Sequence, residues 1–159
     1  MEMGISMEDA GIGLNKVSLM ENRLNIKGKG GIKVIDDTYN ASPDSMYSAI
    51  DLLFATKGMR KIAVLGDMLE LGDDSRYYHE QIGEYAARSN VDLLLLTGEM
   101  TAYTAEKAAE VLGESRVIYQ KNQRKFEEQI KTIARPGDVI LVKGSRGMAM
   151  EQIVKLILD

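Results

Sequence analysis

Short apolar runs alternate with amphipathic stretches along most of the chain. After Gly31 the apolar residues form continuous runs, which is typical of strands that are buried on both faces of a parallel sheet. The five runs are residues 32–37, 61–66, 92–98, 116–119 and 138–144. Between them, apolar residues recur at the three- and four-residue spacing of a helix that buries one side. The pattern therefore predicts a strand followed by a helix, five times over.

The ends of the predicted helices carry recognisable signals. Ser42 and Pro43 open the first helix, since proline is tolerated in the first turn, and Gly58 is a suitable stop. Pro136 and Gly137 end the fourth. The other helices are predicted to start near residues 75, 101, 122 and 148, and the last runs to residue 158. Repeated strand–helix units predict an open, doubly wound, Rossmann-like α/β sheet, mostly parallel, with helices on both faces.

Residues 1–31 do not follow this repeat. Residues 14–19 and 23–26 have the composition of short strands, and KGKGG turns the chain into the first parallel strand. We interpret residues 1–31 as a junction segment that supplies an antiparallel edge of the sheet or the tail of a preceding domain. Residues 32–159 then form the α/β domain.

The composition is that of a soluble globular protein. Of the 159 residues, 45% are hydrophobic and 28% are charged, which is enough for one domain with a real core. The net charge of −4 disfavours non-specific binding to nucleic acid or to an anionic membrane, but it leaves a local basic pocket open. No apolar run is long enough to span a bilayer, and the N-terminus lacks the apolar core of a signal peptide. We therefore expect a cytoplasmic protein with no nucleic-acid partner and no membrane insertion.

Polar and charged side chains gather at one edge of the predicted sheet. Ligands of open α/β sheets bind outside the carboxyl ends of the strands. Those ends carry acids, a hydroxyl, an amide and two cations, in the segments DDTYN (36–40), GD (66–67), TGE (97–99) and KGSRG (143–147). The amino ends carry Arg60, Lys61, Asp92 and Asp138, which we interpret as ordinary solvated strand starts. This asymmetry is the main functional signal of the sequence.

The KGSRG segment has the features of an anion site. Glycines on both sides of Ser145 allow backbone N–H groups to approach a ligand, and the segment is predicted to open a helix, whose N-terminus favours anions. Lys143 offers a point charge, and Arg146 offers a planar fork that suits a phosphate or a carboxylate. An ordinary strand-to-helix turn with two exposed basic side chains explains residues 143–147 equally well.

The acidic residues of this edge allow two interpretations. Asp36 and Asp37 suit ribose hydroxyls or Mg²⁺, but for one of them a turn or capping role is favoured. Asp67 or Glu70 can face the same site. His79, the single histidine, falls on the inward stripe of its helix, which favours a packed residue over a general base. No G-x-x-x-x-G-K-[ST] motif occurs, so the chain carries no P-loop of its own.

Taken in order, DDTYNASPDSM, AVLGDMLELG, a histidine on the next helix and GDVILVKGSRGMAME resemble the C-terminal domain of the Mur ligase family. The resemblance covers nearly the whole chain from about Gly4, and the blocks keep the order and spacing of the family. One difference is Ser42-Pro43 where the family usually has Asn-Pro, and both residues can cap the helix. Within the family, the chain resembles the members that add D-alanyl-D-alanine to UDP-N-acetylmuramoyl-tripeptide.

The resemblance implies a three-domain, ATP-dependent enzyme of peptidoglycan synthesis. ATP phosphorylates the substrate carboxylate, and the dipeptide amine then attacks the acyl phosphate to form an amide bond. The C-terminal domain helps to bind ATP and the dipeptide, and its closure excludes water from the acyl phosphate. The P-loop and the Mg²⁺ ligands belong to the central domain. The resemblance thus implies that this chain holds no metal, has no catalytic residue of its own, is inactive alone and is monomeric.

The resemblance also assigns residues. Those assigned to ATP are Arg23, Asp36, Asp37, Tyr39 and Asn40. Asp37 is favoured over Asp36 for the ribose because it lies nearer the loop, and Arg23 follows Asn22 where the family usually has glycine. Those assigned to the dipeptide, near its carboxylate, are Lys143, Ser145 and Arg146.

Two other interpretations stay open. A receiver-like signalling domain also has an acidic pair after its first strand and a lysine after its last, but Thr97 stands at its phosphoacceptor position and Gly144 where proline is common. A stand-alone nucleotide- or peptide-binding module derived from a ligase is the second. The junction-like residues 1–31 favour a piece of a longer enzyme over such a module.

Overall fold

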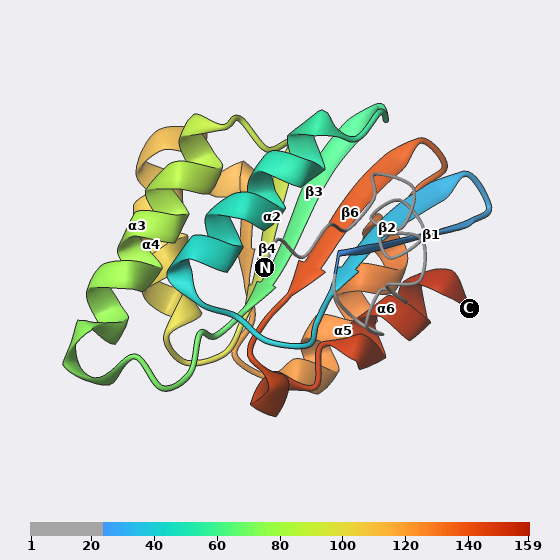
Figure 1. Cartoon of the computed structure of the whole chain (residues 1–159). Coiled ribbons are helices and arrows are strands. Elements are labelled where there is room, and N and C mark those ends of the chain that lie inside the picture. Colours follow the sequence, from blue (N-terminus) through green and yellow to red (C-terminus); the bar gives the residue numbers. More distant parts are fainter. Residues whose placement is uncertain (1–23) are drawn as a thin grey trace, which may run out of the picture.

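A computed structural model of the chain describes residues 24–159. In this part, six strands form one sheet in the order β1-β2-β6-β3-β4-β5 (Figure 1). The strands are β1 (Asn25–Lys29), β2 (Ile32–Asp37), β3 (Arg60–Gly66), β4 (Leu93–Thr97), β5 (Val117–Tyr119) and β6 (Asp138–Lys143). β1 pairs antiparallel with β2, and all the other pairs are parallel. The predicted doubly wound sheet and its antiparallel edge are confirmed, while the domain boundary at residue 31 stays a prediction.

The helices cover both faces of the sheet. They are α2 (Pro43–Ala55), α3 (Ser75–Arg88), α4 (Thr101–Leu112), α5 (Gln123–Ile133) and α6 (Glu151–Leu158). In Figure 1, α2, α3 and α4 lie on one face, and α5 and α6 lie on the other. The last helix begins later than predicted, because residues Arg146–Met148 form a 3-10 turn and Ala149 adopts the left-handed conformation, with φ 49° and ψ 39°. The KGSRG segment therefore does not open α6, and the prediction of a helix N-terminus there is wrong.

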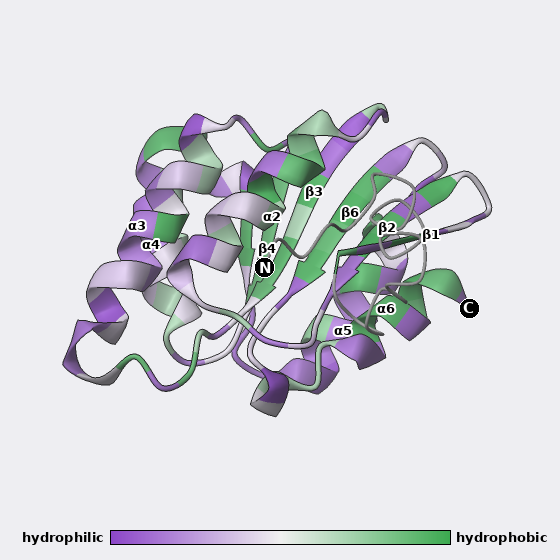
Figure 2. Cartoon of the chain, in the orientation of Figure 1, coloured by the Kyte–Doolittle hydropathy of each residue, from purple (hydrophilic) through white to green (hydrophobic). Residues whose placement is uncertain are grey.

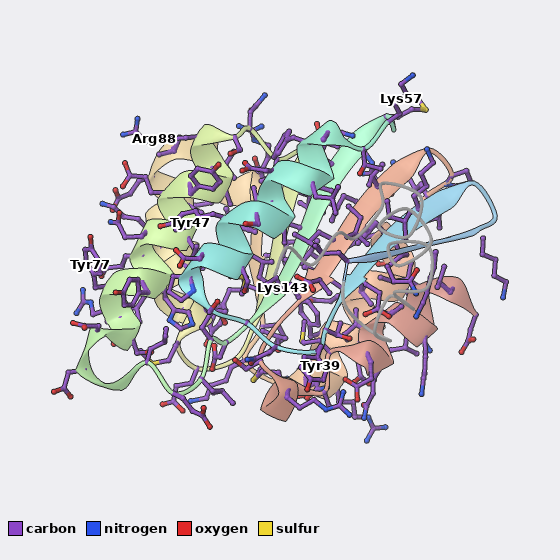
Figure 3. The ribbon with its side chains drawn as sticks, viewed as in Figure 1. Tyr39, Tyr47, Lys57, Tyr77, Arg88 and Lys143 are labelled. Atoms are coloured by element: carbon purple, nitrogen blue, oxygen red, sulfur yellow. The ribbon has the colours of Figure 1, made fainter. Side chains whose placement is uncertain are left out.

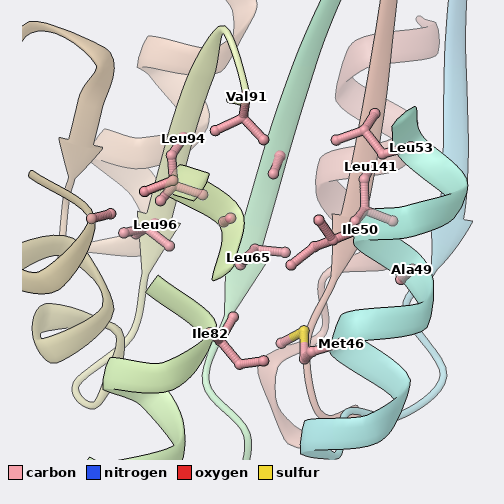
Figure 4. Close-up of a cluster of buried hydrophobic side chains, with 14 of the residues drawn as sticks. Met46, Ala49, Ile50, Leu53, Leu65, Ile82, Val91, Leu94, Leu96 and Leu141 are labelled. Carbon is pink, nitrogen blue, oxygen red and sulfur yellow. The ribbon is translucent and has the colours of Figure 1, made fainter. Parts of the chain in front are cut away.

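The parallel strands send alternate side chains into two hydrophobic cores. Ile35, Leu65 and Leu141 belong to the core beneath α2 and α3. Figure 4 shows Leu65 and Leu141 among the side chains of these helices. Their chain neighbours Val64 and Val142 point toward α5 and α6. Since both faces of the sheet are covered, the strands read as continuous apolar runs, and Figure 2 shows hydrophobic strands beneath helices with hydrophilic outer sides.

α3 and α4 pack closely against each other. A Cβ atom on Gly83 of α3 would lie 2.4 Å from the backbone oxygen of Thr104 in α4. The Thr104 hydroxyl group also donates to the backbone oxygen of His79 at 3.0 Å. The glycine therefore sets how near the two helices come, and this contact fixes the part of α3 that carries His79.

The amino edge of the sheet holds an ion pair whose carboxylate is buried. Arg60 Nε and Nη2 donate to the two carboxylate oxygens of Asp138 at 2.8 and 2.7 Å, and the Asp138 side chain is 2% exposed. The N–H of Arg135 adds a third bond to Asp138 at 2.8 Å. The interpretation of these residues as solvated strand starts is wrong for Asp138, which joins β6 to β3.

Candidate functional site

The polar residues of the carboxyl edge come together as predicted. The register places Asp37 beside Lys143, Lys143 beside Leu65, and Gly66 beside Thr97. The loops that follow β2, β6, β3 and β4 are therefore neighbours in that order. Figure 3 shows Tyr39 at this end of the sheet and Lys57 at the opposite end.

Asp36 is occupied by contacts within the protein. One carboxylate oxygen accepts from Lys27 Nζ at 2.6 Å, and the other accepts from the hydroxyl group of Thr38 at 2.8 Å. Its residue is 1% exposed. These contacts tie β1 to β2 and start the turn after β2. Of the two neighbouring aspartates, Asp36 thus has the turn role, and we leave it out of the ligand site.

Asp37 and Lys143 form a second buried ion pair. Lys143 Nζ donates to Asp37 Oδ2 at 2.5 Å and to the backbone oxygen of Asn40 at 2.8 Å. The Lys143 side chain is 1% exposed. The other oxygen of Asp37 accepts a longer bond, 3.3 Å, from the N–H of Leu24. We call residues 37–40 the nucleotide loop, because they include Asp37, Tyr39 and Asn40, three of the residues that the family resemblance assigns to ATP.

Ser145 joins three loops. Its hydroxyl group accepts from the N–H of Leu69 at 2.8 Å and donates to the backbone oxygen of Ala41 at 3.4 Å. Its own N–H donates to the backbone oxygen of Asp67 at 3.0 Å. Ser145 is 4% exposed, so this side chain organises the loops after β2, β3 and β6 from the inside.

Three side chains of this edge reach solvent. Tyr39 is 37% exposed, and Asn40 and Arg146 are also exposed. Within residues 24–159 the Arg146 guanidinium group has no hydrogen bond and no ion pair. An exposed phenol ring, an amide and an unpaired guanidinium group on adjacent loops can meet a planar base, a sugar and an anionic group. Arg23, the remaining residue assigned to ATP, lies outside the described residues.

Asp67 turns out to be a helix cap. Its carboxylate oxygens accept from the N–H groups of Glu99 and Thr101, both at 2.8 Å, at the start of α4. Of the two residues predicted as alternatives to face the site, Asp67 is buried in this cap, whereas Glu70 is exposed beside Leu69. The sequence signal was Gly98, where a Cβ atom would lie 2.2 Å from the Asp67 carboxylate. The contact between Gly98 and the aspartate of the neighbouring strand cannot be inferred from the sequence without knowing which strands are adjacent.

His79 is packed inside the protein, as predicted. Its ring N–H at Nδ1 donates to the backbone oxygen of Ser75 at 2.7 Å, and Nε2 accepts from the N–H of Met68 at 3.1 Å. Burial lowers the pKa of His79 below its usual 6.5. The neutral imidazole ring thus holds the start of the loop after β3, and it is not exposed to act as a general base.

Two further features are absent from the described part of the chain. Within residues 24–159, no three histidine, aspartate or glutamate side chains are placed to hold a metal ion. None of the helices in that part of the chain is long and apolar enough to cross a membrane.

A doubly wound sheet with a polar, partly cationic carboxyl edge is typical of the α/β domains whose ligands bind at that edge. The particular family follows from the sequence: residues 22–146 match the family described as "Mur ligase, glutamate ligase domain", and the chain belongs to the Mur ligase family. Membership of this family decides against the receiver-like interpretation.

Individual relatives agree with this assignment. The chain is 39% identical, over 158 residues, to UDP-N-acetylmuramoyl-tripeptide–D-alanyl-D-alanine ligase of Bacillus subtilis, covering 98% of this chain and 35% of that protein. A crystal structure of MurF from Acinetobacter baumannii superposes with a TM-score of 0.83 at 30% identity, over 98% of this chain and 34% of that one. MurF ligase from Thermotoga maritima in complex with ADP gives 0.72 at 28% identity, over 97% and 33%. The chain thus spans about a third of the length of the relatives it matches.

Proposed function

We propose that this chain is the C-terminal domain of an ATP-dependent ligase that adds D-alanyl-D-alanine to UDP-N-acetylmuramoyl-tripeptide in peptidoglycan synthesis. The observation that carries the proposal is the 39% identity to such a ligase along 98% of this chain. The cytoplasmic location and the monomeric state implied by the family resemblance belong to the same proposal.

The carboxyl edge suits the two ligands that the domain would help to bind. Tyr39 and Asn40 would line the nucleotide, and Asp37, whose side chain is 9% exposed, would reach a ribose hydroxyl only at the edge of its carboxylate. Arg146 would meet the dipeptide carboxylate, because a planar guanidinium group donates hydrogen bonds to both oxygens of a carboxylate. ATP would supply the phosphoryl group that activates the tripeptide carboxylate. The domain adds binding and closure, which excludes water from a hydrolysable acyl phosphate.

Two ligand assignments change in the light of the contacts. Lys143 and Ser145 are buried and bonded to protein groups, so we assign them to the support of the loops instead of the dipeptide. Mg²⁺ ligands and the P-loop are expected in the rest of the ligase. This chain alone should therefore release no ADP.

The test is ADP release by the complete gene product with ATP, Mg²⁺, UDP-N-acetylmuramoyl-tripeptide and D-alanyl-D-alanine. We expect release only when both other substrates are present, and none from the 159-residue chain alone. Arg146→Ala should raise the KM for the dipeptide, and Arg124→Ala on the exposed side of α5 is the matched control. A gene product of this length that binds nucleotide without turnover would instead establish a stand-alone binding module.

A further inference from the structure

Lys143 ends β6 with its ammonium group turned into the protein. Two of its acceptors, Asp37 Oδ2 and the backbone oxygen of Asn40, belong to the nucleotide loop. A ligand carboxylate that bound this ammonium group would have to displace a buried ion pair, which leaves a desolvated charge without its partner. Lys143 therefore acts on protein groups and not directly on a ligand.

The two acceptors lie at opposite ends of the nucleotide loop. Asp37 is the last residue of β2, and Asn40 comes after the turn that carries Tyr39. One ammonium group thus fixes both ends of the loop to β6. Buried charge-assisted hydrogen bonds of this kind tolerate little change of geometry, because water cannot take the place of either partner.

The same strand end also leads directly into Arg146. Between the two residues, Ser145 bonds to the loops on either side of β6 through Ala41 and Leu69. A ligand that orders Arg146 therefore acts on a segment that is already tied to the nucleotide loop. Lys143 and Ser145 thus form a side-chain path by which a shift at one loop reaches the other.

We propose that Lys143 is a positioning residue that couples the two ligands, so that nucleotide binding at residues 37–40 strengthens dipeptide binding at Arg146. This inference rests on the proposed function. Coupling of two binding sites is reciprocal, so the dipeptide must strengthen nucleotide binding by the same factor. When the link through Lys143 is removed, each ligand keeps its own contacts, but the factor by which one ligand strengthens binding of the other approaches one.

The test compares Lys143→Met with Lys57→Met in the complete ligase, because Lys57 is exposed at the opposite end of the sheet (Figure 3). Calorimetry measures the Kd of a non-hydrolysable ATP analogue with and without saturating D-alanyl-D-alanine. Wild type and Lys57→Met should show coupling of about fivefold or more, within the usual allosteric range. Lys143→Met should show less than about twofold, and its KM values for both ligands should rise more than its kcat falls.

The outcomes separate coupling from plain stability. A folded Lys143→Met ligase with wild-type coupling overturns the proposal, even if its melting temperature drops, because a merely structural lysine changes stability alone. A wild-type ligase that does not consume ATP with the dipeptide overturns the proposed function instead. Amide exchange in the 159-residue chain is independent of that activity: Lys143→Met should speed exchange at residues 38–41 by about tenfold or more and leave α4 unchanged. Unchanged exchange at residues 38–41 also overturns the proposal.

A second variant covers the case in which Lys143→Met does not fold. Ser145→Ala keeps the ion pair and removes only the hydroxyl bonds to Leu69 and Ala41. It should lower the coupling by about two- to threefold, a loss at the low end of single hydrogen-bond effects. Ser48→Ala is its control, since that hydroxyl group bonds only within its own helix, to the backbone oxygen of Asp44 at 3.0 Å. Equal coupling in the two alanine variants would refute the positioning role.

Discussion

Replacing Arg60 by methionine should strongly destabilise the protein. Asp138 would keep one donor, the N–H of Arg135, of the three that now serve its buried carboxylate. Each lost charge-assisted bond contributes roughly 1.5–3 kcal/mol. The Arg60 side chain is 32% exposed, so water would reach part of the site and lessen the loss. We expect the free energy of unfolding to fall by about 2–4 kcal/mol, which corresponds to a melting temperature lower by roughly 5–15 °C.

Urea unfolding of Arg60→Met, Asp138→Asn and the double variant measures the pairwise coupling energy, provided that the m-value stays constant. The control is the surface pair Arg124–Glu128, whose N–O distance is 3.8 Å and whose side chains are 89% and 70% exposed. That pair should show almost no coupling. The reasoning is refuted if the buried pair couples no more strongly than the surface pair.

Three further changes test other parts of the fold. Because the pKa of His79 is lowered, the unfolded chain binds its proton first, so stability should be complete above about pH 7 and fall below pH 6.5 by up to about 1.4 kcal/mol per pH unit. Unfolding of His79→Gln at pH 7.5 and 5.5 should lack that part of the pH dependence. Gly83→Ala should cost at least about 1–2 kcal/mol in chemical denaturation, because its Cβ atom would press on Thr104, and an unchanged midpoint would contradict the close packing. Ala149→Gly should raise stability by about 0.5–1 kcal/mol by relieving a left-handed alanine, whereas a decrease would contradict this strain.

The sequence predicted the fold best where strands are buried on both faces of the sheet, because such burial favours apolar residues at successive positions. Continuous apolar runs could be recognised without the fold, because β3 and β6 have helices on each side, so that all of β6 and all of β3 after Lys61 are buried. The edge that carries the candidate site could also be predicted, since a parallel sheet brings the carboxyl ends of its strands to one edge. The start of α6 could not be predicted, because alanine has no preference for the left-handed conformation that Ala149 adopts.

The candidate site was predicted by residue type but not by role. Asp36 and Asp37 are adjacent letters, yet one is bonded to Lys27 and the other to Lys143. Likewise, the cation of Lys143 is buried, while that of Arg146 is exposed. These differences follow from which way alternate residues point and from which strand lies next to which. Neither the order of the strands in the sheet nor the ion-pair partner of each charged side chain can be predicted from the residues around it.

The direction of β1 has a consequence for how a larger site would assemble. Because β1 runs antiparallel to β2, its first neighbour Leu24 lies beside Asp37, at the ligand edge. Whatever precedes residue 24 in a longer protein is thus tethered next to the nucleotide loop. Docking then becomes an intramolecular event with an effective concentration in roughly the millimolar range for a short flexible connection. A longer connection should weaken closure without altering a single contact, since it lowers the effective concentration of one half of the site near the other.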